Sequence, residues 1–369
     1  ENVRLFDETK EALEQQKASA EVLGAISASI TDTKPVFDKI LESCVRLFEG
    51  NQVGIIVVRE DGRGHLAAYN GLDSLREGFP IPLNRQSATG VAIMERRVLH
   101  FADVLNDPDV PEFLRRNAAR TDRRSIMVAP MLRDGQGVGA IFVGRPFVGT
   151  FSEKAIRLLK TFAAQAVIAI ENVRLFNETR EALEQQKATA ELLGVIAASA
   201  TDTQPVFDAI AKTCVRLFGG KTVGVALVRG NHVELAAFAT TEGLQARQDY
   251  EAHFPLPLNE GSITGRAILG SKVVYVQDVQ ADPKLGERAK AAGRALGYRN
   301  VLCAPMMREG KGIGGINVVR DAPDAPPYSE KQIALIKVFA DQAVIAIENA
   351  RLFNETKEAL ERQTATAEI

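Results

Sequence analysis

Apolar residues recur at helical spacing in a segment that occurs twice along the chain. After TDTKPVFD and again after TDTQPVFD, apolar side chains follow one another three or four residues apart, which places them on one core-facing stripe of a helix. Pro35 and Pro205 fit the first turn, and Gly50 and Gly220 are predicted to end the helices. The apolar positions are Val36, Phe37, Ile40, Leu41, Cys44, Leu47 and Phe48 in the first copy and Val206, Phe207, Ile210, Cys214, Leu217 and Phe218 in the second.

Apolar and β-branched runs after each helix predict strands. QVGIIVVR and TVGVALVR lead through turns to HLAAY and VELAAF. Further along, SIMVAPMLRDGQGVGAIFVGR and NVLCAPMMREGKGIGGINVVR each predict two strands joined by a Gly-rich hairpin turn. A short helix with a serine N-cap and a polar helix lie between them. The loop before FPLPLN is longer than its counterpart before FPIPLN, and such loops are where function tends to diverge.

A linker sequence occurs three times. ENVRLF(D/N)ET(K/R)EALEQQ begins at Glu1 and Glu171, and a near-copy begins at Glu348. A repeat this long is a whole domain with its connector. We therefore expect two copies of one domain on three linker helices, cut from a longer array. The predicted boundaries are a helix at 1–32, a domain at 33–151, a connecting helix at 152–202, a second domain at 203–328 and a last helix at 329–369.

The connecting segment has heptad spacing from Phe162 onward, with small or apolar residues at alternating steps of four and three. A single chain cannot bury such a stripe along a helix outside its own domains, so a parallel homodimer is expected. Arg180 and Lys187 fall on the seam, which makes the coil marginal and suits an element that changes register. The predicted seam consists of Phe162, Ala166, Ala169, Val173, Phe176 and Leu183.

Composition excludes several classes of function. A net charge of −2 gives no general reason to expect a nucleic-acid or membrane partner. No apolar run is long enough to span a bilayer, and the absence of tryptophan argues against base stacking. Three cysteines without CxxC spacing favour a reducing compartment, so a cytoplasmic location is expected.

The order of elements and motifs resembles a GAF domain, over roughly residues 33 to 170 and 203 to 347. The matching motifs are PLN with a later glycine, DV followed by DP, APM, G(V/I)G and (F/Y)SE, each present in both copies. The resemblance implies an α+β fold, with an antiparallel sheet, flanking helices and a ligand pocket in each domain, joined by long coiled-coil-like helices. It also implies a regulatory module upstream of a histidine kinase, nucleotide cyclase or phosphodiesterase. The linkers look like the signalling helices of bacterial sensor kinases.

Neither catalytic nor metal-binding residues are predicted. There is no Ser/His/Asp set, HExxH motif or Walker loop, and the four histidines share no repeat position. Nucleotide-binding relatives in this family carry a Phe that is followed by Asp-Glu. Phe101 and Asp103 are present, but no Asp-Glu follows, and the second copy has Val276. These departures argue against cyclic nucleotides, and no cofactor is assigned.

Candidate ligand contacts are Arg124, Asp103, Tyr298, Arg299, Asp278 and Cys303. The arginines end a basic helix that borders the pocket in the resembling fold, so with Tyr298 they could hold an anion. The alternative is a solvated polar face. Asp103 and Asp278 equally fit turn-forming positions before Asp-Pro. Cys303 lies on an apolar strand and either packs in the core or faces the pocket.

Three functions remain open. The chain could be a sensory module that binds a small molecule and relays its presence through dimeric helices to a kinase or cyclase domain. It could be a dimerisation spacer with empty pockets. It could be a GAF-type redox enzyme. A polar pocket closed by the 239–253 loop would favour the sensory module. A pocket filled by its own side chains would favour the spacer, and two neighbouring cysteines would favour the redox enzyme.

Overall fold

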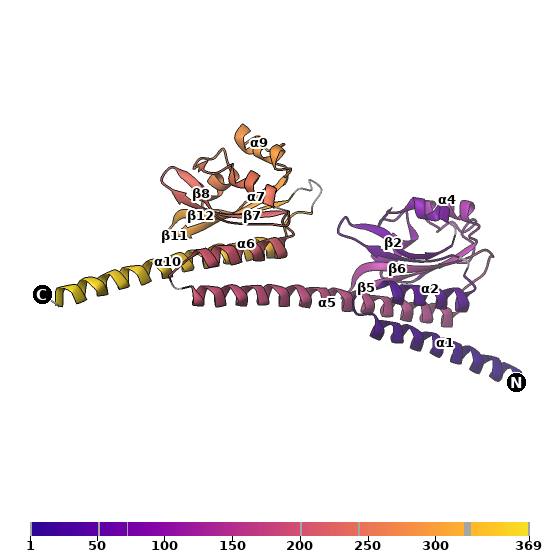
Figure 1. The fold of residues 1–369 in the computed structure, drawn as a ribbon. Coiled ribbons are helices and arrows are strands. Elements are labelled where there is room, and N and C mark those ends of the chain that lie inside the picture. Colours follow the sequence, from indigo (N-terminus) through magenta and orange to yellow (C-terminus); the bar gives the residue numbers. More distant parts are fainter. Residues whose placement is uncertain are drawn as a thin grey trace. The chain divides into compact units, whose positions relative to one another are not determined.

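The computed structural model describes residues 2–50, 52–71, 73–199, 201–242, 244–320 and 326–367. The chain forms two compact units, Glu1–Glu181 (unit 1) and Ala182–Ile369 (unit 2). Each unit contains one six-stranded antiparallel sheet with flanking helices (Figure 1). The predicted α+β fold in two copies is confirmed, and the long helix α5 begins in unit 1 and ends in unit 2.

In unit 1 the strands follow the order β3-β2-β1-β6-β5-β4, so the sheet centre is formed by the first strand and the last hairpin. The elements are α1 (Asn2–Ala28), α2 (Lys34–Phe48), β1 (Gln52–Val58), β2 (Arg63–Asn70), the 3-10 helix η1 (Asp73–Gly78), β3 (Ile81–Pro82), α3 (Ala88–Glu95), β4 (Leu99–Phe101), α4 (Glu112–Thr121), β5 (Ser125–Arg133), β6 (Gln136–Arg145) and α5 (Glu153–Ala198).

Unit 2 repeats this topology with the order β10-β11-β12-β7-β8-β9. A full helix, α7, occupies its longer loop where unit 1 has η1. The elements are α6 (Gln204–Phe218), β7 (Thr222–Arg229), β8 (His232–Thr240), α7 (Leu244–Glu251), β9 (Leu256–Pro257), α8 (Ile263–Leu269), β10 (Val274–Val276), α9 (Glu287–Ala295), β11 (Asn300–Arg308), β12 (Lys311–Arg320) and α10 (Glu330–Ala367).

Each sheet separates two layers of side chains. In unit 1, Ile141 and Val143 of β6 face a core made with α1, α2 and α5, whereas Ala140 and Phe142 face the opposite side, under α3 and α4. This alternation follows from the two-residue period of a strand. We call the first layer the helix-side core and the second the pocket-side layer. Figure 1 shows α2 and α5 against one face of this sheet and α4 over the other.

Local signals set most helix ends as predicted, with one difference. Ser87 and Ser262 each accept a hydrogen bond at 3.0 Å, from the amides of Gly90 and Gly265, as N-caps do. The left-handed residue that ends the first helix of each domain, however, lies one position before the predicted glycine. The left-handed residue is Glu49 at φ 52° in α2 and Gly219 at φ 58° in α6.

The first part of the predicted dimer seam lies inside unit 1. Phe162, Ala166 and Ala169 are at most 1% exposed and belong to the helix-side core. The ring of Phe162 packs edge-to-face against Phe48, with 6.4 Å between the centroids. The prediction that these three residues face a second chain is therefore corrected, because α5 turns this stripe toward its own domain.

The remaining seam residues are more accessible. Val173 is half-buried, and Phe176 and Leu183 are 37% and 48% exposed. A seam through this part of α5 stays a prediction, as do the domain boundaries. None of the described helices is both long and apolar enough to cross a membrane.

Candidate ligand pocket

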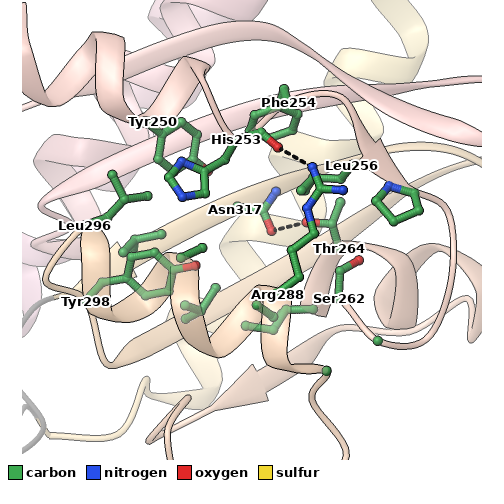
Figure 2. Close-up of a pocket in the computed structure, with 18 of the residues that line it drawn as sticks. Tyr250, His253, Phe254, Leu256, Ser262, Thr264, Arg288, Leu296, Tyr298 and Asn317 are labelled. Carbon is green, nitrogen blue, oxygen red and sulfur yellow. Dashed lines mark hydrogen bonds between the residues drawn. The ribbon is translucent and has the colours of Figure 1, made fainter.

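Unit 2 holds a cavity of about 280 Å³ in its pocket-side layer. Its floor is formed by β11 and β12, and its walls by α7, α8, α9 and the segment from His253 to Pro257 (Figure 2). Tyr250 and His253 come from the longer loop of the second copy. The 239–253 loop therefore contributes to the cavity wall, and its helix α7 places Tyr250 against the cavity.

Asn317 is the polar group on the floor. It lies on β12 between Ile316 and Val318, which face the helix-side core, and is 4% exposed. Its Oδ1 accepts a hydrogen bond of 3.0 Å from Thr264 Oγ1 of α8 (Figure 2). Its Nδ2 has no hydrogen-bond partner among the described residues. Buried amides are normally satisfied, so this donor marks a place where a partner is missing.

Aromatic side chains form one wall of the cavity. The rings of Tyr250 and Phe254 lie 5.6 Å apart, and Tyr250 also packs on Phe238 at 4.8 Å. Tyr298, just after α9, also lines the cavity (Figure 2). Burial raises the pKa of Tyr298 to about 12 and raises the pKa of Tyr250 as well, so both phenols stay neutral at physiological pH.

The charged side chains that line the pocket lie at its mouth. Glu287 and Arg288 line it from the start of α9 but are exposed. Arg288 Nη2 donates to the carbonyl oxygens of His253 and Pro255 at 3.3 and 3.2 Å. These bonds tie α9 to the segment that covers the cavity, which gives Arg288 a closing function at the rim.

The corresponding region of unit 1 is almost filled, with a cavity of about 50 Å³. Phe142 occupies the position on β6 that Asn317 occupies on β12. Phe142 pairs with Gly54 and Val128 on the neighbouring strands. Asn317 pairs with their counterparts, Gly224 and Cys303. The Phe142 ring is 4% exposed. The cavity is therefore small because the Phe142 ring extends over the sheet from the position where unit 2 has the smaller Asn317.

A buried arginine completes the filling of unit 1. Arg123 is the counterpart of Tyr298, because each stands directly before the arginine that ends the basic segment, Arg124 or Arg299. The guanidinium carbon of Arg123 lies 5.2 Å from the centroid of the Phe142 ring. It donates to Gln52 Oε1 through Nη2 at 2.5 Å and Nε at 3.1 Å. Burial lowers its pKa to about 10.

The helix above the unit 2 pocket, α9, also carries smaller side chains than its counterpart in unit 1, α4. The third and sixth residues of α4 are Leu114 and Asn117, whereas those of α9 are Ala289 and Ala292. All four line their pockets. Smaller side chains on α9 and the change from Phe142 to an asparagine on the floor together account for the larger cavity.

Of the residues predicted to contact a ligand, only Tyr298 lines the cavity. Arg299 instead pairs with Asp278 at 3.1 Å, and Arg124 pairs with Asp103 at 3.4 Å. The anion-holding prediction is therefore corrected for both arginines, because each points to an aspartate outside the pocket.

The two aspartates shape turns. Asp103 Oδ1 accepts from the Leu105 amide at 3.2 Å, and Asp278 Oδ1 accepts from the Gln280 amide at 2.9 Å. A hydrogen bond from Asn106, with further bonds from Leu105 and Arg124, holds the pKa of Asp103 below its usual range. Their assignment as ligand contacts is replaced by the turn-forming alternative.

Cys303 is fully buried in the pocket-side layer but does not line the cavity. All three cysteines are free and buried, and burial raises the pKa of each thiol. A raised pKa removes the thiolate that redox chemistry needs. Among the described residues, no group of three or more His, Cys, Asp or Glu side chains could hold a metal ion.

Sequence reasoning missed Asn317, Thr264 and Tyr250. A signal for the first was present, since INVVR carries an asparagine where IFVGR carries a phenylalanine within otherwise apolar strands. Comparison of the two copies at this position would have pointed to an open pocket in the second.

The chain belongs to the GAF domain family. A model of the GAF domain matches residues 31–171 and 200–348, so both units are GAF domains in tandem. A curated relative, the dual 3′,5′-cyclic-AMP and -GMP phosphodiesterase 11A of Takifugu rubripes, is 21% identical over 261 residues. The match covers 67% of this chain and 29% of the phosphodiesterase, so the chain spans less than a third of that relative's length.

Two solved structures are similar to this chain. A bacteriophytochrome from the photosynthetic bacterium R. palustris matches with a TM-score of 0.53 and 12% identity, over 92% of this chain and 75% of that one. The free methionine-R-sulfoxide reductase of Neisseria meningitidis matches at 0.38 and 19% identity, over 47% of this chain and 93% of the reductase. The first likeness shows the fold alone, and the second carries no argument about activity.

Proposed function

We propose that this chain is the sensory part of a larger signalling protein, in which unit 2 binds a small molecule and the long helices relay its presence. The observation that carries the proposal is the cavity over Asn317, with a buried amide donor that lacks a partner. A domain without a ligand would be expected to fill such a space, as Phe142 does in unit 1.

The relay runs through β12 to α10. Asn317 faces the cavity, while its neighbours Ile316 and Val318 pack in the helix-side core together with Phe339 of α10. At the far end of the hairpin, Arg308 Nη1 lies 3.1 Å from Glu348 Oε1 at the start of the repeated linker sequence. A ligand that shifts β12 therefore acts on both the core contacts and the ion pair of α10.

The linker helices are proposed to pair with a second copy of this chain. Large apolar residues are exposed at the same repeat positions in all three linker helices, whereas isolated surface apolar residues would have no reason to recur. Their exposed fractions range from 37% to 70%. The recurring residues are Phe6, Phe176 and Phe353, and Leu13, Leu183 and Leu360.

Unit 1 fits the spacer alternative better than the sensory one. Its pocket is filled by Phe142 and Arg123, so we assign it a structural function in setting the distance and pairing of the helices. The redox alternative lacks support from the cysteines, which are buried and separate. We therefore propose a non-enzymatic module whose effector, a histidine kinase or a cyclase, lies outside this segment.

Native mass spectrometry of the purified chain tests ligand binding and dimerisation together. We expect a dimer mass with a small molecule that is released on activation, and no such molecule from the Asn317→Phe variant. A ligand-free wild type that remains ligand-free after incubation with cell extract would contradict the sensory assignment.

A second measurement isolates the dimer. Leu183→Glu with Leu360→Glu should raise the dimer dissociation constant at least about tenfold in sedimentation experiments, because two buried charges would face each other. The control exchanges Glu181 and Glu358 for lysine on the opposite helix face. A wild type that is monomeric at micromolar concentration would rule the relay out.

A further inference from the structure

We infer that the unit 2 pocket takes an uncharged, flat and mainly apolar molecule of about two fused rings, with one hydrogen-bond acceptor that meets Asn317 Nδ2. The inference rests on the proposed function, since it names the class of ligand for the same cavity. It differs from the anion expected from the basic helix. Size, charge, the amide donor and the filled pocket of unit 1 each support it.

The size of the cavity sets the size of the ligand. An apolar cavity of roughly 150 Å³ holds one benzene ring. The unit 2 cavity measures about 280 Å³, which is enough for two fused rings and too small for a large chromophore. Tyr250, Phe254 and Tyr298 offer ring faces and edges to a flat molecule, and such contacts favour aromatic partners.

The charges around the pocket favour a neutral ligand. Arg299 is paired with Asp278 away from the cavity, and Arg288 is exposed at the rim and donates to two carbonyl oxygens. No buried cation lines the cavity among the described residues. A carboxylate or phosphate placed beside Asn317 would lose its hydration, and Arg288, the charged donor that lines the cavity, is already bonded to two backbone carbonyls at the rim.

The orientation of Asn317 specifies an acceptor. Thr264 Oγ1 donates to Asn317 Oδ1, and Asn317 Nδ2 is left without a partner among the described residues (Figure 2). Asn317 is 4% exposed and Thr264 is 5% exposed, so water reaches this amide only through the cavity. A ligand carbonyl or ring nitrogen would satisfy the donor, and an unsatisfied donor would disfavour a ligand without one.

Unit 1 shows that an aromatic ring fits at this place in the fold. The Phe142 ring rises from the floor position of Asn317 and packs beside Tyr69 at 6.2 Å. Gly54 beneath it has no side chain, and a Cβ there would come within 2.4 Å of the Phe142 ring. Unit 2 keeps a glycine, Gly224, at the same position, where a Cβ would come within 2.8 Å of the Tyr250 hydroxyl oxygen. Tyr250 therefore supplies the ring over this glycine, and a ligand ring would lie beside it.

Equilibrium dialysis with three probes on the full chain tests this class. Coumarin is neutral, has two rings and carries a carbonyl; naphthalene lacks the acceptor; and 2-naphthoate carries a negative charge. We expect coumarin to bind at least about tenfold more tightly than either of the others. Asn317→Leu keeps the volume but removes the donor, so the preference for coumarin over naphthalene should fall to about one.

Two further variants guard against a folding defect. Ala289→Leu copies the residue of unit 1 and should block all three probes from the helix side, as Asn317→Phe does from the floor. Asn231→Leu makes the same chemical change as Asn317→Leu on an exposed turn and should leave every affinity unchanged.

Each contrary outcome has one meaning. Binding of 2-naphthoate as tight as that of coumarin would overturn the neutral class while leaving unit 2 as a ligand-binding domain. Equal binding of coumarin and naphthalene to the wild type would show that Asn317 does not select an acceptor. Binding of none of the probes would refute the inference, and the native mass measurement would decide separately whether the proposed function fails.

Discussion

Phe142 and Asn317 occupy the same position of the same strand in two copies of one domain, and they give the copies different properties. The phenylalanine stacks under a buried arginine and closes its pocket, whereas the asparagine lies on the floor of a cavity of about 280 Å³. The sheet order, strand register and glycine beneath this position are the same in both. A domain can therefore be changed from a filled support into a receptor at a few positions that leave its scaffold alone.

The largest difference between the two units is expected in the free energy of unfolding that is lost when Phe142 or Asn317 is truncated to alanine. Phe142→Ala should lower the free energy of unfolding of unit 1 by about 3–5 kcal/mol, because it opens a void in a packed layer. Asn317→Ala should cost unit 2 only about 1 kcal/mol, since one side of the residue already faces space. The chain has no tryptophan, so hydrogen exchange of peptides from β6 and β12 in urea would measure each unit separately.

The control for this measurement is Phe147→Ala, which truncates a phenylalanine that is 43% exposed and should cost little. Equal losses in the two units would mean that the second pocket is as well packed as the first, and the contrast between them would fail.

The hydrogen bond that orients Asn317 provides the next test. Thr264→Val keeps the shape of the side chain but leaves Asn317 Oδ1 without its donor. We expect a loss of about 2 kcal/mol in the unfolding free energy of unit 2, the usual cost of an unsatisfied buried group. Thr89→Val at the corresponding position of unit 1, where Phe142 offers no acceptor, serves as the matched control. Equal effects in both units would argue against the bond.

Alkaline pH should act on the two pockets in opposite directions. The pKa of Arg123 is lowered from 12.5 to about 10, so above pH 10 this group binds more protons in the unfolded chain and adds stability to unit 1, against the loss that the raised pKa of the Cys44 thiol causes there. The pKa of Tyr298 is raised from 10.0 to about 12, so the folded chain binds more protons above pH 10 and unit 2 loses stability. Each change approaches about 1.4 kcal/mol per pH unit.

Substitutions of Arg123 and Tyr298 test whether these two residues cause the changes in stability with pH. Arg123→Met should remove the contribution of Arg123 in unit 1. Tyr298→Phe should remove the contribution of Tyr298 in unit 2, where the raised pKa values of Tyr250 and Cys303 act in the same direction. Both are measured by hydrogen exchange between pH 9 and 11. The same slope in both units before and after the substitutions would refute the assignment.

The smallest expected effect concerns a feature that the units share. Hydrogen bonds from Arg174 and Arg133 lower the pKa of Glu171, and those from Arg351 and Arg308 lower the pKa of Glu348. Glu348→Gln should reduce the exchange protection of α10 slightly above pH 4.5. The difference from the wild type should vanish as the pH falls through the lowered pKa, because the carboxylate is then protonated in both states.

Glu171→Gln should behave in the same way for α5. A clear effect on one helix and none on the other would mean that the contrast between the units extends beyond their pockets to the linkers.

Much of the fold could be predicted from local patterns. The serine N-caps, the apolar stripes of α2 and α6 and the hairpin turns depend on residues close together in sequence. The turns at Asp134-Gly135 and Glu309-Gly310 adopt positive φ angles as a Gly-rich hairpin requires. Because these signals occur twice in the same order, the order of elements in both domains followed from local patterns, and the antiparallel sheet followed from the resemblance to a GAF domain.

The candidate site could not be predicted in the same way. A basic helix beside a pocket suggested an anion, but the partners of Arg124 and Arg299 are aspartates 21 residues away along the chain. Heptad spacing suggested a seam through Phe162, although the same spacing also suits a helix packed on its own sheet. Periodicity identifies the buried face of a helix without identifying what covers it.

The sequence by itself determined the repeated architecture, because hydrophobic period, turn residues and capping act over a few neighbouring residues. Only the tertiary structure decided that one pocket is filled and the other open. That difference depends on which side chains from β12, α7 and α9 meet over the sheet, and on whether their volumes and hydrogen bonds match. Asn317 is an ordinary polar residue in the sequence, and it becomes a candidate ligand contact because the fold buries its amide without a partner.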